Sequence, residues 1–353
     1  MKNVDFSLTK RILITGGAGF IGGALIRRLL SEKNLVIFNL DKMSYASDLT
    51  SINNKLKTLK ESSAEYYFVK ADLFNRSAIY DAICKVNPDI VFHLAAESHV
   101  DRSINGPKNF IESNVVGTFN LLDVLKNYWD KLSPERQEDF RFIHVSTDEV
   151  FGSLYGDGSF TEKTPYDPRS PYSASKAASD HLVKAWYNTY GLPVITTNCG
   201  NNYGPWQFPE KLIPLSMIKG KLGKSIPLYG DGLNIRNWLY VDDHVDALLL
   251  VAQKGEVGES YCIGGSEEFT NLQVVKSICG FLDEYFPALS PHDCFIKLVE
   301  DRMGHDRKYS INSSKIRSTL GWSPKYNFNQ GLKLTFDWFI KHSQWSEDRL
   351  IKI

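Results

Sequence analysis

The stretch RILITGGAGFIGG (11–23) decides the fold of this 353-residue chain, because it joins a buried strand to a helix through a glycine-rich turn. Its first part, RILIT, is a continuous apolar run, which is typical of a parallel strand covered by helices on both faces. Glycines 16, 19 and 22 follow in a GxxGxxG pattern. Gly16 permits a tight turn, Gly19 lets the backbone approach a pyrophosphate, and Gly22 allows close packing of helix on strand. The stretch therefore predicts a dinucleotide-binding turn.

Apolar runs of the same kind recur at 35–41 (LVIFNLD), 89–96 (DIVFHLAA) and 140–147 (FRFIHVST). Helix-like segments separate them, at 21–31, 77–86 and 110–128. Strands that alternate with helices in this way form right-handed βαβ units. We therefore expect an α/β protein built on a Rossmann, doubly wound parallel sheet.

The amino-acid composition changes after about residue 190, and positions 198–234 are rich in Pro, Gly, Asn and aromatic residues. We expect residues 1–197 to form the nucleotide-binding domain with the catalytic residues. Residues 198–353 are then expected to form a smaller α/β substrate-binding lobe, partly interleaved with the first domain.

The composition excludes several classes of protein. Lys plus Arg and Asp plus Glu both number 41, so the formal net charge is zero, which argues against nucleic acid as the main partner. The five cysteines, at 84, 199, 262, 279 and 294, never form a CxxC pair, so neither a disulfide scaffold nor a metal site is expected. No apolar run approaches the ~18 residues that cross a bilayer, and residues 1–10 lack the apolar core of a signal peptide. We expect a soluble, cytoplasmic protein that binds neither membrane nor metal.

Two acidic residues follow predicted strands. Asp41 ends the second strand, nineteen residues after Gly22, where a carboxylate accepts hydrogen bonds from both hydroxyls of an adenosine ribose. It would repel a 2′-phosphate, so NAD is favoured over NADP. Asp72, the last residue of EYYFVKAD (65–72), suits the adenine amino group.

The segment Tyr172-Ser-Ala-Ser-Lys176 places a phenol and an amine on one face of a helix. A phenol normally titrates near ~10. A neighbouring ammonium and a positively charged nicotinamide both favour the phenolate, so Tyr172 would be a usable base. Lys176 would also hold the nicotinamide ribose.

Five segments carry a resemblance to a known family: STDEVFG (146–152), PYSASK (171–176), NCGNNYGPWQFPEKLIP (198–214), IRNWLYVDDH (235–244) and DRMGHDRKY (301–309). With them the chain resembles, over residues 9–340, the extended short-chain dehydrogenase/reductases, also called the NAD-dependent epimerase/dehydratase superfamily. Within that superfamily it is similar to the dTDP-glucose 4,6-dehydratases. The resemblance implies an enzyme of deoxysugar biosynthesis, a carbon–oxygen lyase, that takes dTDP-glucose to the 4-keto-6-deoxy sugar with NAD as cofactor.

The resemblance also implies roles for the catalytic residues. Tyr172 would take the proton of the C4 hydroxyl, with Thr147 hydrogen-bonded to that oxygen, while hydride passes to NAD. The resulting C4 ketone acidifies the C5 hydrogen, so Glu149 would remove it as base while Asp148 donates a proton to the leaving C6 hydroxyl. Hydride would then return to C6. Because the cofactor ends as it began, it should stay bound.

Binding residues are carried over in the same way. The cofactor site would contain Gly16, Gly19, Phe20, Ile21, Gly22, Asp41, Lys42, Ser44, Asp72, Leu73, Leu94, Ala95, Ala96, Ser113, Tyr172, Lys176 and Asn202. The substrate site would contain Ser98, Thr147, Asn201, Lys211, Leu212, Pro227, Tyr229, Arg236, Asn271, Asp301 and His305. His99 is a further polar candidate for the pocket.

The chain departs from the family at Phe151, Gly200 and Met303, where Tyr, Ser and Pro are common. The last two put the preference for thymidine over uridine in doubt, so a UDP-glucose 4,6-dehydratase or another nucleotide-sugar epimerase or dehydratase remains the alternative. A non-catalytic NAD-sensing module is a more distant one, since a sensor has no use for an acid and a base.

The resemblance further implies a homodimer formed by two helices from each subunit. These would be the 110–128 helix and the helix of Tyr172, which carries apolar residues on more than one face: Leu182, Val183, Trp186 and Tyr187.

Overall fold

The computed structural model describes residues 9–59 and 64–350. Its centre is a seven-stranded sheet of order β3-β2-β1-β4-β5-β6-β10, in which all neighbouring strands are parallel. The strands are β1 (Lys10–Thr15), β2 (Leu35–Asp41), β3 (Glu65–Lys70), β4 (Ile90–His93), β5 (Arg141–Thr147), β6 (Val194–Cys199) and β10 (Ser260–Ile263). The doubly wound α/β fold expected from the sequence is confirmed.

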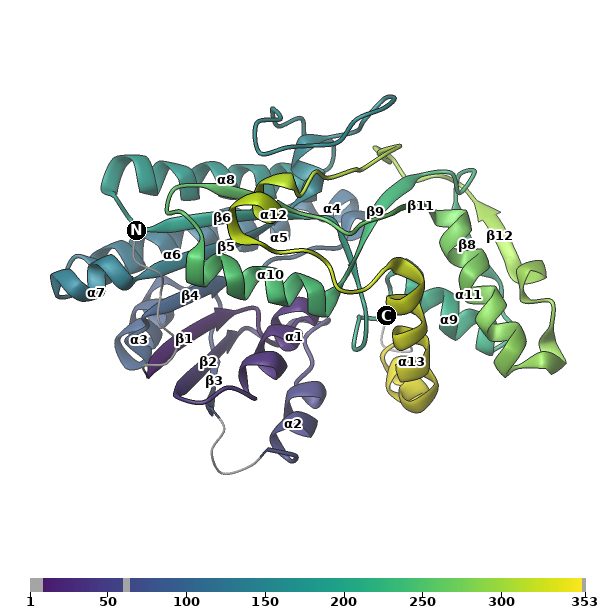
Figure 1. Cartoon of the computed structure of the whole chain (residues 1–353), viewed down its shortest axis with the longest axis horizontal. Helices are drawn as coiled ribbons and strands as arrows, with labels where there is room; N and C mark the ends of the chain where they lie inside the picture. Colours follow the sequence, from purple (N-terminus) through teal and green to yellow (C-terminus); the bar gives the residue numbers. More distant parts are fainter. Residues whose placement is uncertain (1–8, 60–63, 351–353) are drawn as a thin grey trace.

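Helices cover both faces of this sheet, which explains why its strands read as unbroken apolar runs. One face is covered by α1 (Phe20–Leu29), α10 (Val241–Lys254) and α12 (Ser314–Leu320), and the other by α3 (Arg76–Val86), α6 (Gly117–Trp129) and α8 (Pro171–Tyr190) (Figure 1). Shorter helices complete this part: α2 (Thr50–Leu56), α4 (Val100–Asn105), α5 (Pro107–Phe110), the π-helix η1 (Ile111–Val116), α7 (Pro134–Asp139) and the 3₁₀-helix η2 (Asp148–Phe151).

A smaller lobe lies at the right of Figure 1. A three-stranded sheet of order β11-β9-β7 and a β8–β12 pair contribute to it, with β7 (Asn201–Tyr203), β8 (Ile226–Tyr229), β9 (Ile235–Tyr240), β11 (Glu268–Thr270) and β12 (Ile296–Val299). Its helices are α9 (Leu212–Lys221), α11 (Asn271–Tyr285), η3 (Pro287–Leu289), η4 (His292–Phe295) and α13 (Phe328–Leu350). Ile213, Ile278 and Phe336 belong to the buried cluster that joins α9, α11 and α13.

The two parts are interleaved in sequence. Strand β6 runs through position 197, and β10 then pairs with it after the chain has formed β7, α9, β8 and β9. Helix α10 likewise packs on α1, which covers the seven-stranded sheet. The chain therefore crosses between the two parts several times, and the cavity described below lies where they meet.

Two elements differ from the sequence-based expectation. Strand β4 ends at His93 rather than at position 96, because Leu94 and the residues after it leave the sheet and line the cavity. The helix expected over 110–128 is a continuous run of α5, η1 and α6, whose middle is wound as a π-helix. Such turns are rare and frequently lie at functional sites.

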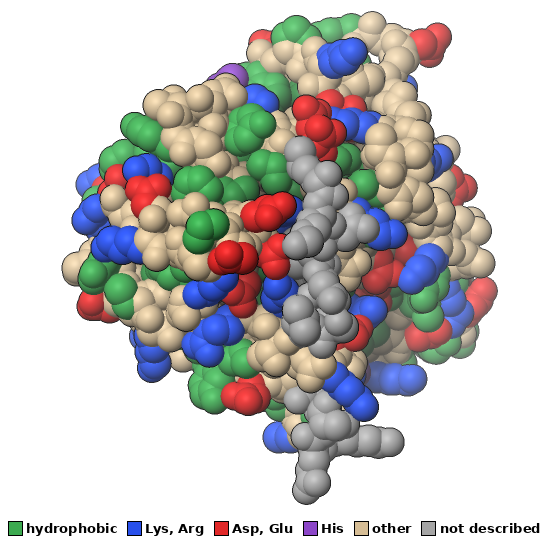
Figure 2. Space-filling view, turned by 60° about the vertical axis from the view of Figure 1, so that its left-hand side comes forward, with side chains coloured by type: hydrophobic (Ala, Val, Ile, Leu, Met, Phe, Trp, Pro, Cys, Tyr) green, Lys and Arg blue, Asp and Glu red, His purple; other side chains and the backbone are tan. Residues whose placement is uncertain are grey.

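Figure 2 shows acidic and basic side chains interspersed over the visible face, as the balanced charge of the chain leads one to expect. Within residues 9–59 and 64–350, no helix combines the length and the apolar character needed to span a lipid bilayer. Residues 1–8, which bear on the expected lack of a secretion signal, lie outside the described residues.

Candidate active site

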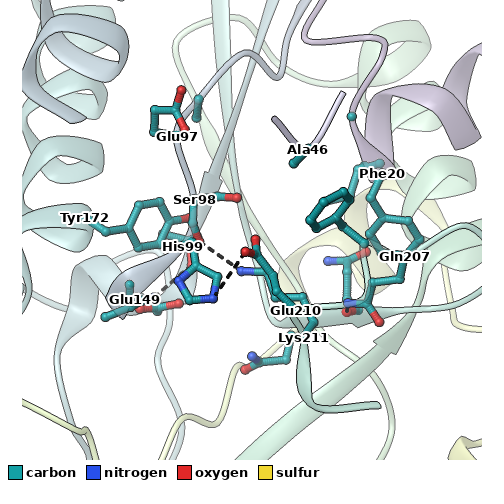
Figure 3. Close-up of a pocket in the computed structure, with 18 of the residues that line it drawn as sticks. Phe20, Ala46, Glu97, Ser98, His99, Glu149, Tyr172, Gln207, Glu210 and Lys211 are labelled. Carbon is teal, nitrogen blue, oxygen red and sulfur yellow. Dashed lines mark hydrogen bonds and ion pairs between the residues drawn. The ribbon is translucent and has the colours of Figure 1, made fainter. Parts of the chain in front are cut away.

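A cavity of about 550 Å³ opens at the carboxyl ends of β1, β2, β4 and β5 and extends to the smaller lobe. This is where parallel α/β sheets bind ligands. Every residue that the sequence predicts for cofactor, substrate or catalysis lines this cavity except Asp301. Figure 3 shows Tyr172 and Glu149 on one side of the pocket and Phe20 and Gln207 on the other.

The glycine turn at the end of β1 leaves no room for side chains. Gly16 has φ +72°, and a Cβ there would lie 2.6 Å from the backbone nitrogen of Ala95. A Cβ on Gly22 would lie 2.4 Å from the carbonyl oxygen of Gly16. Helix α1 begins just after this turn with no side-chain cap and no acidic residue in its first turn, so its N-terminus is suited to an anion. The turn fits the pyrophosphate of NAD.

The carboxylate of Asp41 organises the loop that follows β2. It accepts hydrogen bonds from the backbone nitrogens of Ala18 (3.0 Å) and Met43 (2.8 Å) and from Oγ of Ser47 (2.9 Å). Asp41 also lines the cavity, so it combines the position predicted for a ribose acceptor with a structural role that the sequence does not reveal.

Two adjacent carboxyl groups lie where β5 ends and η2 begins. Oγ1 of Thr147 lies 3.4 Å from Oδ1 of Asp148 and accepts a hydrogen bond from the backbone nitrogen of Glu149 (3.3 Å). Oδ2 of Asp148 is buried without a hydrogen-bond partner in the described part of the chain. Burial, followed by the charge of Glu149, raises the pKa of Asp148 to about 8. Asp148 is therefore a protonated acid at neutral pH.

Glu149 is surrounded differently. Burial raises its pKa too, but the cations Arg302, Arg236 and Lys211 oppose the rise. These charges favour the carboxylate, while Asp148 is left with an unpartnered oxygen. A carboxyl group that keeps its proton, beside one whose charged form is favoured by three cations, can act as acid and base in the same reaction.

Helix α8 presents Tyr172 and Lys176 to the cavity. Its start is fixed by Ser170, whose side chain accepts from the backbone nitrogen of Ser173 in a capping box, with Pro171 as first residue. Burial and then Glu149 raise the pKa of the Tyr172 phenol well above its usual value, and a hydrogen bond with Thr147 opposes the rise. In this structure burial dominates, so the pKa of Tyr172 is raised rather than lowered as the sequence leads us to expect.

Basic side chains from several elements reach the substrate side of the cavity. Nζ of Lys211 donates to the carbonyl oxygen of Ser98 (3.1 Å), as Figure 3 shows, and Arg236 lies with its guanidinium 4.2 Å from the ring centre of Tyr309. Asp301 lies off the cavity wall. Its Oδ1 is 2.6 Å from Nδ1 of His305, so it orients that ring rather than facing the cavity.

Several lining residues escape the sequence analysis. The side chain of Glu210 is 7% exposed and forms an ion pair with Arg102 (3.5 Å). Its carboxylate also lies 3.6 Å from the ring of His99 and accepts a hydrogen bond from the hydroxyl of Tyr45 (2.8 Å). In the sequence, Glu210 directly precedes the predicted substrate residue Lys211, and this position is the signal by which it could have been found. Gln207, Trp238, Arg302 and Tyr309 also line the cavity.

Asn114, in the π-helix η1, shows how a residue without a local motif supports the site. It accepts from the backbone nitrogen of Glu97 (2.8 Å), donates to the carbonyl oxygen of Glu97 (3.0 Å) and donates to Oγ of Ser175 (2.9 Å). It thereby ties the loop after β4 to α8.

Gly200 and Met303, which depart from the family pattern and were expected near the nucleotide, lie in different places. Gly200 lines the cavity, and a Cβ there would lie 2.7 Å from the carbonyl oxygen of Asn237. Met303 is 74% exposed and does not line it. Among the described residues, no group of three or more His, Cys, Asp or Glu side chains is arranged to hold a metal ion.

Comparisons with known proteins show the family to which this chain belongs. A family model described as GDP-mannose 4,6 dehydratase matches residues 13–335. A dTDP-glucose 4,6-dehydratase of Xanthomonas campestris pv. campestris is 51% identical over 335 residues, which are 94% of this chain and 94% of that protein. A dTDP-glucose 4,6-dehydratase of Bacillus anthracis, solved in complex with NAD, superimposes with a TM-score of 0.82 at 42% identity, over 96% of this chain and 99% of that one. A UDP-glucose 4-epimerase of Thermotoga maritima has a TM-score of 0.80 but only 27% identity, over 94% and 99% of the two chains.

Proposed function

Since this chain belongs to the dTDP-glucose 4,6-dehydratase family, we propose that it converts dTDP-glucose to dTDP-4-keto-6-deoxy-glucose and water. When bound at the glycine turn, NAD supplies the hydride acceptor for C4 and the hydride donor for C6. Arg236 suits the substrate diphosphate because a guanidinium donates two hydrogen bonds at once, and Lys211 adds a second positive charge.

The side chains of this site have separate tasks. Tyr172 takes the proton of the C4 hydroxyl, whose oxygen Thr147 holds by a hydrogen bond. Glu149 removes the C5 proton once C4 is a ketone. Asp148 then gives its proton to the C6 hydroxyl, which leaves as water. As hydride returns to C6, Glu149 gives the proton back to C5. The proton that Tyr172 takes from the C4 hydroxyl equals the one that Asp148 gives up, so the protons balance once these two groups exchange with solvent.

The observation that carries the proposal is the buried, unpartnered carboxyl oxygen of Asp148, whose pKa is raised to about 8, next to Glu149. A 4-epimerase moves hydride at C4 alone and has no leaving group to protonate. Incubating the protein with dTDP-glucose and, separately, with UDP-glucose tests the proposal. We expect the 4-keto-6-deoxy product, with its absorbance in alkali, from dTDP-glucose. Product from UDP-glucose alone would assign the uridine alternative, and product from neither would refute the proposal.

The pH dependence of turnover should report Asp148. Its pKa of about 8 means that the proton donor is present below pH 8 and is lost as the pH rises through that value. We expect kcat for overall turnover to fall above pH 8. An Asp148→Asn variant should show low turnover with no such fall, whereas an unchanged pH profile in that variant would remove Asp148 from the assignment.

NAD(H) should copurify with the protein, because a reaction that regenerates its cofactor gains nothing from releasing it. Denaturing the purified protein and assaying the supernatant for nicotinamide nucleotide measures this. A preparation that contains none and turns over without added NAD would contradict it.

We also propose a homodimer and a cytoplasmic location. Ile111 and Phe119 on the η1–α6 run and Tyr190 on α8 are apolar or aromatic side chains exposed by 42–48%, and Phe119 and Trp186 pack edge to face between the two helices. Val183, which the sequence assigns to the interface, is instead fully buried in the core of its own chain. Light scattering at micromolar concentration should give twice the 40.0 kDa chain mass. A monomer would refute the dimer.

A further inference from the structure

Asp180 is a buried carboxylate on α8, one helical turn beyond Lys176 and absent from the cavity wall. Four donors surround it: Nε2 of His144 (2.9 Å), Oγ of Ser146 (2.8 Å), the hydroxyl of Tyr166 (2.9 Å) and Nδ2 of Asn198 (3.3 Å). They come from β5, from β6 and from the segment before α8. Hydrogen bonds of this number stabilise the charged form of a carboxyl group, and the pKa of Asp180 is lowered despite its burial.

Lys176 is buried to the same extent, at 4% exposure, but is sparsely bonded. Its Nζ donates to the carbonyl oxygen of Val145 (3.0 Å). A neutral carbonyl does not balance an ammonium charge, and a buried charge needs an opposite one nearby. Positions 176 and 180 share one face of the helix, four residues apart. The carboxylate of Asp180 is therefore near enough for its charge to act on the ammonium group of Lys176.

The other titratable groups that face Lys176 and Asp180 do not supply a negative charge that balances the ammonium group of Lys176. Burial lowers the pKa values of His93 on β4 and His144 on β5, so both rings are neutral. Nδ1 of His144 has no hydrogen-bond partner in the described residues, as fits a neutral ring that donates through Nε2. Burial raises the pKa of the Cys199 thiol on β6 to about 12, and that of Tyr166 also rises, so both stay protonated.

We propose that Asp180 is a positioning residue whose carboxylate keeps Lys176 in its ammonium form, so that Lys176 can favour the phenolate of Tyr172 during oxidation of C4. The same carboxylate holds Ser146, the residue before Thr147, and so fixes the end of β5. This inference rests on the proposed function, in which Tyr172 is the base of the first step.

The direction of the effect follows from the charges. Burial lowers the pKa of Lys176, and Asp180 is the first of the groups that raise it again. Without the negative charge at position 180, Lys176 loses its proton at lower pH. The high-pH limb of C4 oxidation should therefore move down by about one pH unit or more, the size usual for loss of a close opposite charge.

The test is an Asp180→Asn variant, with Tyr166→Phe as the matched control that removes one hydrogen bond to Asp180 but leaves its charge. Both are placed in a Glu149→Gln background, so that the NADH formed on C4 oxidation accumulates. Its rate of appearance after mixing with dTDP-glucose is followed against pH. We expect the high-pH limb to move down in Asp180→Asn and to stay in Tyr166→Phe. An unmoved limb in Asp180→Asn, or an equal shift in both, would overturn the proposal.

A stability measurement covers the case in which Asp180→Asn does not fold. Replacing Lys176 by Met in the same chain removes the uncompensated charge, so Lys176→Met/Asp180→Asn should fold and unfold at a higher temperature than Asp180→Asn. No recovery would show that Asp180 serves its four donors rather than Lys176. This comparison needs no turnover. A wild-type protein that makes no 4-keto sugar therefore refutes the proposed function, whereas the double variant judges the pairing of Lys176 with Asp180.

Discussion

Glu149→Gln is expected to lower turnover by about 10²–10⁴-fold, the usual cost of losing a general base, while leaving C4 oxidation in place. Glutamine keeps the size and hydrogen-bonding shape of the side chain but cannot accept the C5 proton. Tyr172, Thr147 and Lys176 are unchanged, so adding dTDP-glucose should still produce NADH absorbance. The measurement combines steady-state assay of the 4-keto sugar with stopped-flow absorbance of NADH.

Tyr172→Phe is the matched opposite of this variant. Phenylalanine fills the same buried space but leaves the C4 proton without an acceptor, so the early NADH signal itself should disappear. Exchange of the C5 hydrogen with deuterated solvent provides a second readout, present in the wild type and lost in Glu149→Gln. If Glu149→Gln released product at a near wild-type rate, the base would have to be another group.

Gly22→Ala is expected to abolish retention of NAD and with it nearly all activity. The added Cβ would lie 2.4 Å from the carbonyl oxygen of Gly16 and 2.8 Å from Cα of Gly17, both of them backbone atoms that cannot rotate away. The turn must shift, and the N-terminus of α1 moves with it. The nucleotide content of the purified variant and its affinity for added NAD measure the effect.

Gly23→Ala is the control in the same helix, one residue further on. A Cβ at this buried position would be 3.5 Å from its nearest neighbours, which is ordinary van der Waals contact. Alanine is favoured over glycine within a helix by roughly 0.5–1 kcal/mol, so this variant should keep its NAD and unfold at the same or a higher temperature. Equal loss of NAD in both variants would mean that the close approach at Gly22 is not what the cofactor site depends on.

Sequence patterns only a few residues long are enough to predict the fold of this chain. The run at 35–41 matches β2, and the run at 140–147 matches β5 apart from its first residue. Both are recognisable because a parallel strand covered on both faces is rich in apolar residues. The spacing of Gly16, Gly19 and Gly22 predicts the turn because it meets a steric demand of the backbone itself. Tyr172 and Lys176 belong to the same class, since helical periodicity alone places them on one face.

Tertiary structure decided the properties that depend on which distant segments meet. The raised pKa of Asp148 comes from its burial, and the rise in the pKa of Glu149 is opposed by Arg236 and Lys211 from the other lobe. Lys211 also reaches a carbonyl group 113 residues away. The π-helical turn that seats Asn114 and the donors that gather around Asp180 likewise have no short-range pattern. Desolvation and electrostatic coupling are set by the whole surroundings of a group, so identical residues in the same local sequence would have other pKa values in another packing. The sequence by itself thus determined the fold and the residue types of the site. The pKa values of these residues were decided by the tertiary structure, because burial and the charges of distant segments set them.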